Sequence, residues 1–469
     1  MSRRAIQMLT LVMACGLALS ALPVDDEEAQ KIWDEAQELS RRGNYPKARR
    51  LYEELSEKYP GFEHRDAVAL YLKEENPLLA METVLESGDP ANRVDVFITG
   101  DGYLYEPRAQ KAMVSGAERV TKAFFRNPTY REYQSYFNFH RMNVASEENG
   151  VDGNGRDYNT AFNARSSGGA QGQVTVDRGT VQQYLRASSA NDGLAIVLVR
   201  MGSLGTGGGG VAVVGGENAG TIIHEMGHAF ARLSDEYSSD TGDRGVPRDG
   251  INISNSPEPD DLPWKHFVEA KIPGVSAFEG ADGRAKGAWK PTAKGCAMDG
   301  SGDYCCVCRE SVLLSIYAMV DPIDEVAVEE GQVEIPEGEE KEFQVTVLKP
   351  ASHDLQVTWY LAPFDTTGGG DVLPEPEVVG AARGWRRSPR IARREMPPLL
   401  GEPEEGKSKR TRDGRVEHTF TVEDLDPGNY RLVVRVVDDA RPKGEPFPWV
   451  IEDEHKLLES RRAWTIRVQ

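Results

Sequence analysis

The feature that most constrains this chain is the pattern His-Glu-x-x-His at residues 224–228. Residues four apart on an α-helix are slightly more than one turn apart, so the two imidazoles project from the same face. Two converging neutral imidazoles supply two ligands for a catalytic zinc ion. Glu225 lies beside them, where it can take a proton from a water at the metal instead of binding the metal. The flanking Ile222, Ile223 and Phe230 suit a buried helix, so the pattern predicts a zinc hydrolase.

A catalytic zinc site needs a third protein ligand beside His224 and His228, and one open position. If the helix continued straight, Asp235 would lie about 10 Å along the axis from His228, out of reach of the metal. The chain must therefore end the helix and fold back, and Ser234-Asp235 is a plausible stop. We expect Asp235 to be the third ligand of a single zinc ion, with Glu236 as the alternative.

The N-terminus has the features of an export signal. Ser2-Arg3-Arg4 is positively charged, residues 5–22 are mostly apolar, and small residues allow cleavage after Ala21. We expect residues 1–21 to be a signal peptide and the mature chain to be secreted or periplasmic. Cys15 raises the alternative of a lipoprotein anchor. No later stretch is long and apolar enough to cross a membrane.

The net charge of the chain limits which classes of partner it can bind. The formal net charge is −20, which argues against nucleic acid, because phosphate binding requires clustered Lys and Arg. A protein or peptide substrate is the expected partner. At 469 residues the chain is long enough for two or three domains.

Four cysteines follow the predicted signal peptide, and they are Cys296, Cys305, Cys306 and Cys308. One or two local disulfides are favoured over a second zinc site, because the two well-separated pairs of a zinc ribbon are absent. The adjacent Cys305 and Cys306 are poorly placed to bond each other, so we expect Cys296 to close onto one of the later three.

The pattern of the chain predicts a multidomain α+β protein. Residues 25–76 have the spacing of a single tetratricopeptide-like hairpin, which needs a neighbour to cover its faces, with a third helix at 66–74. Residues 77–322 alternate strands (93–99, 137–144, 194–200) with helices (107–125, 309–319), which predicts an α/β zinc-peptidase domain. Residues 323–469 contain short alternating strands and a tyrosine-corner-like segment ending at Tyr430, which predicts an Ig-like β-sandwich.

Two segments leave alternatives open. The glycine-rich segment 202–210 lacks the Lys-Ser/Thr of a phosphate loop. The following 211–214 predicts a strand that, at a sheet edge, could pair with an extended peptide; a flexible connector is equally possible. The insert 366–415 is rich in Pro, Gly and Arg, which favours a solvated loop, with a binding surface on the sandwich as the alternative.

The combination of motifs resembles the IgA-peptidase family of bacterial zinc metallopeptidases. The resemblance rests on 224–228, on Leu233-x-Asp235-Glu236-Tyr237, on Gly100-Asp101-Gly102-Tyr103, and on Cys296-x-Met298 before 304–309. It covers about residues 93–317 and implies a metzincin-like fold, with Met298 in the Met-turn beneath the metal. Two features depart from these patterns. The family is expected to have proline where this chain has Cys306. A metzincin has Gly seven residues and His or Asp ten residues after the first His, where this chain has Ala231 and Ser234, so the pattern is broken by one residue. Immunoglobulin cleavage does not follow from the resemblance.

The expected function is that of an exported zinc endopeptidase with Glu225 as general base. Tyr237 could donate a hydrogen bond to the oxyanion, or its ring could pack under the loop. Two alternatives remain: a secreted or surface binding protein with a vestigial zinc domain, and a zinc amidase acting on cell-wall peptides. The intact Glu225 argues against the vestigial domain.

Overall fold

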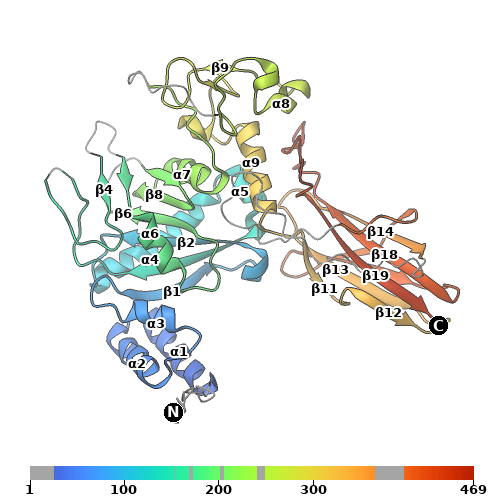
Figure 1. Cartoon of the computed structure of the whole chain (residues 1–469), viewed down its shortest axis with the longest axis horizontal. Coiled ribbons are helices and arrows are strands. Elements are labelled where there is room, and N and C mark those ends of the chain that lie inside the picture. The colour runs from blue at the N-terminus through green and yellow to red at the C-terminus, as the bar shows by residue number, and fades with distance from the viewer. Residues whose placement is uncertain (1–25, 154, 168–172, 201–204, 240–248, 365–395) are drawn as a thin grey trace, which may run out of the picture.

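The structure is a computed structural model that describes residues 26–153, 155–167, 173–200, 205–239, 249–364 and 396–469. The predicted signal peptide, Cys15 and the arginine cluster of the insert lie outside these residues. Figure 1 shows a central α/β part, small helices beside it near the N-terminus, and a set of β-sheets toward the C-terminus. Among the described residues, no helix has the length and apolar character needed to cross a membrane.

The central part is built on a six-stranded sheet with the order β1-β3-β2-β6-β8-β7. Its strands are β1 (Leu78–Leu85), β2 (Val94–Asp101), β3 (Phe137–Val144), β6 (Leu194–Val199), β7 (Thr206–Gly208) and β8 (Val211–Gly215). The four inner strands run parallel, and the edge strands β1 and β7 are antiparallel to their neighbours. Nearly every residue of the inner strands is buried, as expected for parallel strands covered on both faces.

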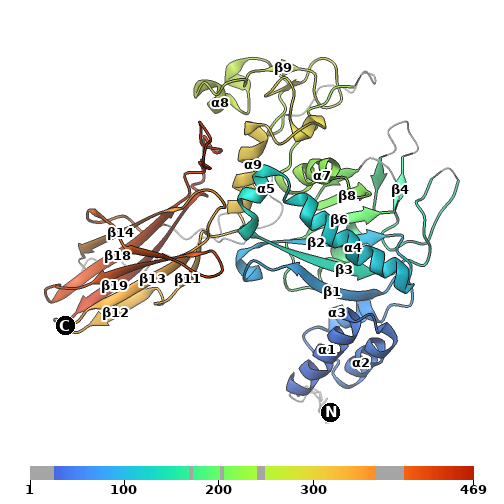
Figure 2. The same ribbon diagram turned by 180° about the vertical axis from the view of Figure 1, so that it is seen from behind.

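Helices cover both faces of this sheet. On one face lie α4 (Pro107–Phe124), α5 (Pro128–Glu132), α7 (Ala219–Ala231) and α9 (Cys306–Tyr317), and on the other α6 (Arg178–Leu185) and the N-terminal helices. Successive residues of β6 alternate between the two cores, so that Ile196 faces α4 and α7 whereas Val197 faces the opposite layer. Figure 2 shows α4 lying across the sheet from behind.

The N-terminal helices form a hairpin packed on the sheet. They are α1 (Asp26–Arg41), α2 (Tyr45–Lys58) and α3 (Arg65–Tyr71). Gly43 takes a positive φ of 75° in the turn between the first two. The rings of Tyr52 and Tyr71 stack with centroids 4.2 Å apart, and their core is continuous with that of the sheet. The third helix ends at Tyr71, three residues before the predicted Glu74.

A loop-rich excursion connects α7 to α9 and lies above the sheet in Figure 1. It contains η3 (Pro259–Asp261), α8 (Lys265–Glu269), β9 (Phe278–Glu279), β10 (Trp289–Lys290) and η4 (Ala297–Asp299). The remaining short elements of the central part are η1 (Pro90–Asn92), η2 (Gln134–Tyr136), β4 (Arg165–Ser166) and β5 (Val174–Thr175). Helix α9 begins at Cys306, three residues before the start predicted at Arg309.

The C-terminal part consists of two sheets around one hydrophobic core that includes Phe343, Trp359 and Trp464. The first sheet has the strand order β11 (Ile323–Val326), β13 (Lys341–Val347), β17 (Val416–Val422), β16 (Lys407–Arg410). The second sheet has the strand order β12 (Gly331–Ile335), β19 (Glu459–Val468), β18 (Gly428–Val437), β14 (Gln356–Pro363), β15 (Pro403–Glu404). The Tyr430 hydroxyl donates to the Asp426 carbonyl at 3.0 Å, which confirms the predicted tyrosine corner. The prediction of a single loop over 366–415 is wrong at its C-terminal end, where β15 and β16 pair with the sheets.

Buried ion pairs attach the C-terminal sheets to the central part. Arg93 makes a bidentate contact with Asp324, at 2.7 and 2.9 Å. His353 bridges Glu132 of α5, at 2.9 Å, and Asp438 after β18, at 2.8 Å. Removing one partner from such buried networks is costly, so the two parts are held in a defined arrangement.

Candidate metal centre

Helix α7 carries the central motif and starts with a side-chain cap. The Asn218 side chain accepts a hydrogen bond from the Thr221 amide at 3.1 Å, which satisfies one of the free amides at the helix start. Ile222, Ile223 and Met226 face the core, whereas His224 and His228 project from the opposite side with partial exposure. The predicted orientation of the two imidazoles is present.

The helix ends at Ala231, earlier than the predicted stop at Ser234-Asp235. Arg232 takes the left-handed conformation, with φ of 57°. The amides of Arg232 and Leu233 both donate back to the Gly227 carbonyl, the latter at 3.0 Å, which closes the end of the helix. This turn reverses the chain and brings Asp235 back toward the helix.

The structure places three donor atoms at the corners of a nearly equilateral triangle. The Nε2 atoms of His224 and His228 are 3.2 Å apart, and each is 3.0 Å from Oδ1 of Asp235. Tetrahedral zinc with bonds of about 2.0–2.2 Å spaces its nitrogen and oxygen ligands about 3.3 Å apart. The triangle therefore has the size that a zinc ion requires.

The outward ring nitrogens of both histidines are fixed by backbone carbonyls. Nδ1 of His224 lies 2.8 Å from the Ala297 carbonyl, and Nδ1 of His228 lies 2.6 Å from the Leu233 carbonyl. A carbonyl can only accept, so each Nδ1 carries a proton, and Nε2 is the atom of each ring that can bind a metal ion at the centre of the triangle. The residues present fit a metal ion with two imidazole ligands and one carboxylate ligand.

The ionisable groups of the site are strongly shifted when no metal is bound. Burial lowers the pKa of His224, but the hydrogen bonds to Asp235 and to the Ala297 carbonyl outweigh it and raise that pKa to about 9. Burial raises the pKa of Asp235, but the two histidines hold it well below its usual range. Asp235 is therefore an anion at neutral pH, and a metal ion competes with a proton for the histidine.

Glu225 is buried beside the donors and does not belong to the triangle. Its carboxylate lies within 4.8 Å of the imidazole nitrogens. Burial raises its pKa to about 7, against the lowering effect of the two histidines. A carboxylate that titrates near neutral pH and lies next to the donors is suited to accept and return a proton.

Tyr237 lies against the third donor. Its hydroxyl donates to Oδ2 of Asp235 at 2.9 Å, and its ring stacks on His224 with centroids 6.1 Å apart. This hydrogen bond orients the carboxylate so that Oδ1 faces the histidines. These contacts differ from both predicted roles, because the ring lies against a metal-binding histidine and the hydroxyl is bonded to Asp235.

Glu236, the alternative ligand, points away from the histidines. Its Oε1 lies 2.9 Å from Sγ of Cys308 and 2.9 Å from Nδ2 of Asn252. The adjacent side chains Asp235 and Glu236 thus face two different sites, because neighbouring residues of an extended segment point in opposite directions.

The predicted disulfide from Cys296 is not formed in the structure. All four cysteines are free, and Sγ of Cys296 is 3.8 Å from Sγ of Cys308, whereas a disulfide bond measures about 2.05 Å. Cys306 is not part of the group formed by the other three and is partly exposed. In the structure the buried carboxylate of Glu236 lies among the other three cysteines, and the spacing of the cysteines in the sequence did not predict this.

Met298 lies directly beneath the motif. A Cβ added at Gly227 would come within 2.6 Å of the Met298 sulfur, so the glycine of the motif makes room for this side chain. The Met298 carbonyl accepts from the Glu236 amide at 2.8 Å. The buried methionine thus supports both the helix and the segment that carries Asp235.

The glycine-rich segment forms the edge strand β7, which packs tightly on α7. A Cβ at Gly207 would fall 2.3 Å from the Glu225 carbonyl and 2.7 Å from Cβ of His228. The expectation that 211–214 forms the edge is wrong, because β7 covers this strand, β8, on its outer side. Glycine is needed here for close approach to the helix.

Two residues that sequence reasoning missed hold the segment with Asp235. The buried Asn252 accepts from the Ser234 amide at 2.8 Å and donates to the Ser234 carbonyl at 2.9 Å. Nζ of Lys290 donates to the Glu236 carbonyl at 2.6 Å. Both residues come from the loop-rich excursion, where no motif marks them.

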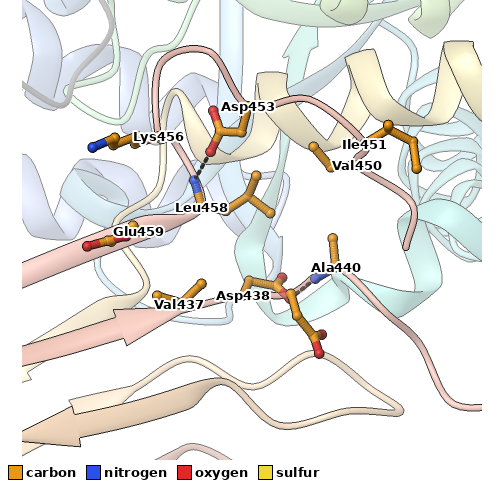
Figure 3. A pocket seen from close by; sticks show the side chains of 10 residues that line it. Val437, Asp438, Ala440, Val450, Ile451, Asp453, Lys456, Leu458 and Glu459 are labelled. Carbon is orange, nitrogen blue, oxygen red and sulfur yellow. Dashed lines mark hydrogen bonds between the residues drawn. The ribbon is translucent and has the colours of Figure 1, made fainter. Parts of the chain in front are cut away.

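A cavity of about 250 Å³ lies between the end of β18 and the segment that leads into β19 (Figure 3). It is lined by Val437–Ala440 and by residues between Val450 and Glu459. None of the residues predicted for the metal site lines it.

One family of known proteins matches part of the chain. Residues 83–274 match the family described as IgA Peptidase M64, which confirms the predicted family resemblance. The matched residues include the histidine motif, Asp235 and β7 but not Met298. None of the curated proteins matches the chain. A solved structure of titin M4 in its trigonal form is 15% identical and covers 31% of this chain and 94% of its own, with a TM-score of 0.13, which is too low to support a structural argument.

Proposed function

We propose that this chain, whose residues 83–274 match a family of peptidases, is an exported zinc-dependent endopeptidase. The observation that carries the proposal is the triangle of donors formed by His224, His228 and Asp235, with edges of 3.0 to 3.2 Å. A zinc ion held there would lower the pKa of a water molecule and polarise the scissile carbonyl.

The side chains around the triangle have the properties that peptide hydrolysis requires. Glu225 accepts the proton of the attacking water and passes it to the departing amine, and its pKa of about 7 suits both transfers. Asp235 remains ionised and balances the charge of the metal. Tyr237 holds the Asp235 carboxylate in place, and this contact supports a positioning role over an oxyanion-binding role.

The edge strand β7 is the candidate platform for the substrate. It is the last strand of its sheet among the described residues, and it borders Glu225 and His228. An extended peptide added to this edge would lie alongside the metal-binding helix. An extended main chain is the substrate feature that such an edge recognises, which favours an endopeptidase over a cell-wall amidase.

We infer three units in the mature chain, with the boundaries expected from the sequence. These are a helical hairpin at 25–76, a metzincin-like peptidase domain at 77–322 and an Ig-like sandwich at 323–469. The methionine beneath the helix and the turn at Arg232 support the metzincin-like assignment: relative to the metzincin pattern, the turn and Asp235 are both displaced by one residue.

The test compares the wild-type mature protein with Glu225→Gln on denatured proteins and on cell-wall peptides, at matched zinc content. We expect internal cleavage of the proteins by the wild type, and a loss of about 10²-fold or more in Glu225→Gln, because general base catalysis contributes that much. Glu258→Gln, an exposed glutamate of the excursion, is the matched control. Equal rates for wild type and Glu225→Gln would refute the proposal, and cleavage restricted to cell-wall peptides would favour the amidase.

A further inference from the structure

A second group of metal-binding side chains lies behind the first site. It consists of Glu236, Cys296, Cys305 and Cys308, and one donor atom from each lies within 4.8 Å of the others. Glu236, Cys296 and Cys308 are fully buried, and Cys305 is 9% exposed. The group joins three segments: the loop after α7, the turn before Met298, and the start of α9.

We propose that these four residues, which we call the Cys3Glu cluster, bind a second, structural zinc ion. Tetrahedral zinc with Zn–S bonds of about 2.3 Å places sulfur ligands about 3.8 Å apart. Sγ of Cys296 and Sγ of Cys308 are 3.8 Å apart, and Oε1 of Glu236 is 3.7 Å from Sγ of Cys305. Oε1 of Glu236 is 2.9 Å from Sγ of Cys308, shorter than the separation of about 3.5 Å in a tetrahedral site, so this pair would move apart when an ion binds. Cys305 and Cys308 also have the Cys-x-x-Cys spacing of structural zinc sites.

The buried carboxylate of Glu236 is the second argument for a cation. Its Oε1 is contacted by Asn252 and Cys308, but its Oε2 is buried with no hydrogen-bond partner among the described residues. Leaving such an oxygen unsatisfied is unfavourable. A disulfide between two of the three cysteines would still leave Oε2 of Glu236 without a partner, whereas a metal ion would engage all four side chains.

The surroundings of the cluster favour thiolates. The amides of Met298 and Cys305 both point at Sγ of Cys296, each at 3.4 Å, and such bonds stabilise a sulfur anion. Helix α9 begins at Cys306, so the positive end of its dipole lies beside Cys305 and favours a negative charge there. Three thiolates and one carboxylate around a dication leave the same net charge as a four-cysteine zinc site.

This inference goes beyond the proposed function, because it assigns the ion a role in folding. Glu236 follows Asp235 directly, and its amide donates to the Met298 carbonyl. An ion bound to the Cys3Glu cluster would therefore fix the third ligand of the catalytic site and the methionine beneath it. It would also close the loop-rich excursion, which has little regular structure to hold it.

The test counts zinc in the mature protein by mass spectrometry and identifies its ligands by X-ray absorption. We expect two zinc ions per chain in the wild type and in Cys306→Ser, the matched control. We expect one ion in His228→Ala, and the X-ray spectrum of that variant should show sulfur at about 2.3 Å. Cys308→Ser should hold at most one ion, without sulfur ligands.

The His228→Ala variant keeps the test decisive even if Cys308→Ser does not fold, because it leaves all four cluster residues intact. A His228→Ala protein that holds no zinc would overturn the inference. A wild-type protein with one zinc ion and an intact mass lower by two hydrogens would also overturn it, in favour of a disulfide. Either result leaves the proposed peptidase activity unaffected, since that depends on Glu225 and the first site.

Discussion

Substitution of Tyr237 by phenylalanine separates a role in positioning Asp235 from a role in binding the oxyanion. The hydroxyl donates to Oδ2 of Asp235 at 2.9 Å, and the Asp235 side chain is 28% exposed. A hydrogen bond to a charged group contributes about 1.5–3 kcal/mol. Loss of such a contact beside a metal ligand reduces metal affinity about 10–100-fold, or roughly 1.4–2.7 kcal/mol.

We therefore expect Tyr237→Phe to bind zinc about 10–100-fold more weakly and to recover most of its kcat when zinc is saturating. The assay is competition for zinc against a chromophoric chelator, followed by peptidase kinetics at high zinc concentration. Tyr105→Phe, an exposed tyrosine on the same part of the chain, is the control. If Tyr237→Phe keeps the wild-type zinc affinity but loses kcat, the hydroxyl acts on the oxyanion and the positioning role is refuted.

Three further predictions follow from the contacts of the structure. Because the metal-free His224 has a pKa of about 9, zinc binding should release at least one proton, and the affinity should rise with pH up to about 9, as calorimetry in buffers of different ionisation enthalpy would show. Gly227→Ala should lower the free energy of unfolding by about 1–3 kcal/mol, measured by denaturant titration, because its Cβ would meet the Met298 sulfur. Burial lowers the pKa of His353, but its bonds to Asp438 and Glu132 outweigh burial and raise that pKa to about 9. The stability that protonated His353 contributes is therefore present below about pH 6.5 and lost as the pH rises through about 9. His353→Gln should flatten the pH dependence of the melting temperature between those values.

The sequence allowed the central strands and the metal-binding helix to be predicted because their signals are local. The inner strands are continuous apolar runs, and β3 has the predicted bounds, 137–144. The pair His224 and His228 needs only helical geometry to converge. The edge strand β1 was missed because its apolar and polar residues do not alternate; the structure buries its first three residues and leaves the rest partly or fully exposed.

The parts of the site that were not predicted depend on backbone groups or on distant residues. The Ala297 and Leu233 carbonyls that orient the histidines leave no trace in side-chain identity. The left-handed turn falls on Arg232 and not on a glycine, so the end of the helix was placed three residues late. The cysteines were interpreted as a disulfide because they lack the two separated pairs of a zinc ribbon, and nothing in the sequence places Glu236, 60 residues before Cys296, among them.

The central claim is that His224, His228 and Asp235 together hold the catalytic ion. The most direct measurement is a crystal structure of the zinc-loaded protein, with anomalous difference maps collected on both sides of the zinc absorption edge. We expect a zinc peak about 2.0–2.2 Å from Nε2 of both histidines and from Asp235, with Glu225 outside bonding distance. A peak bonded to Glu236 in place of Asp235, or no zinc peak beside the two histidines, would contradict it.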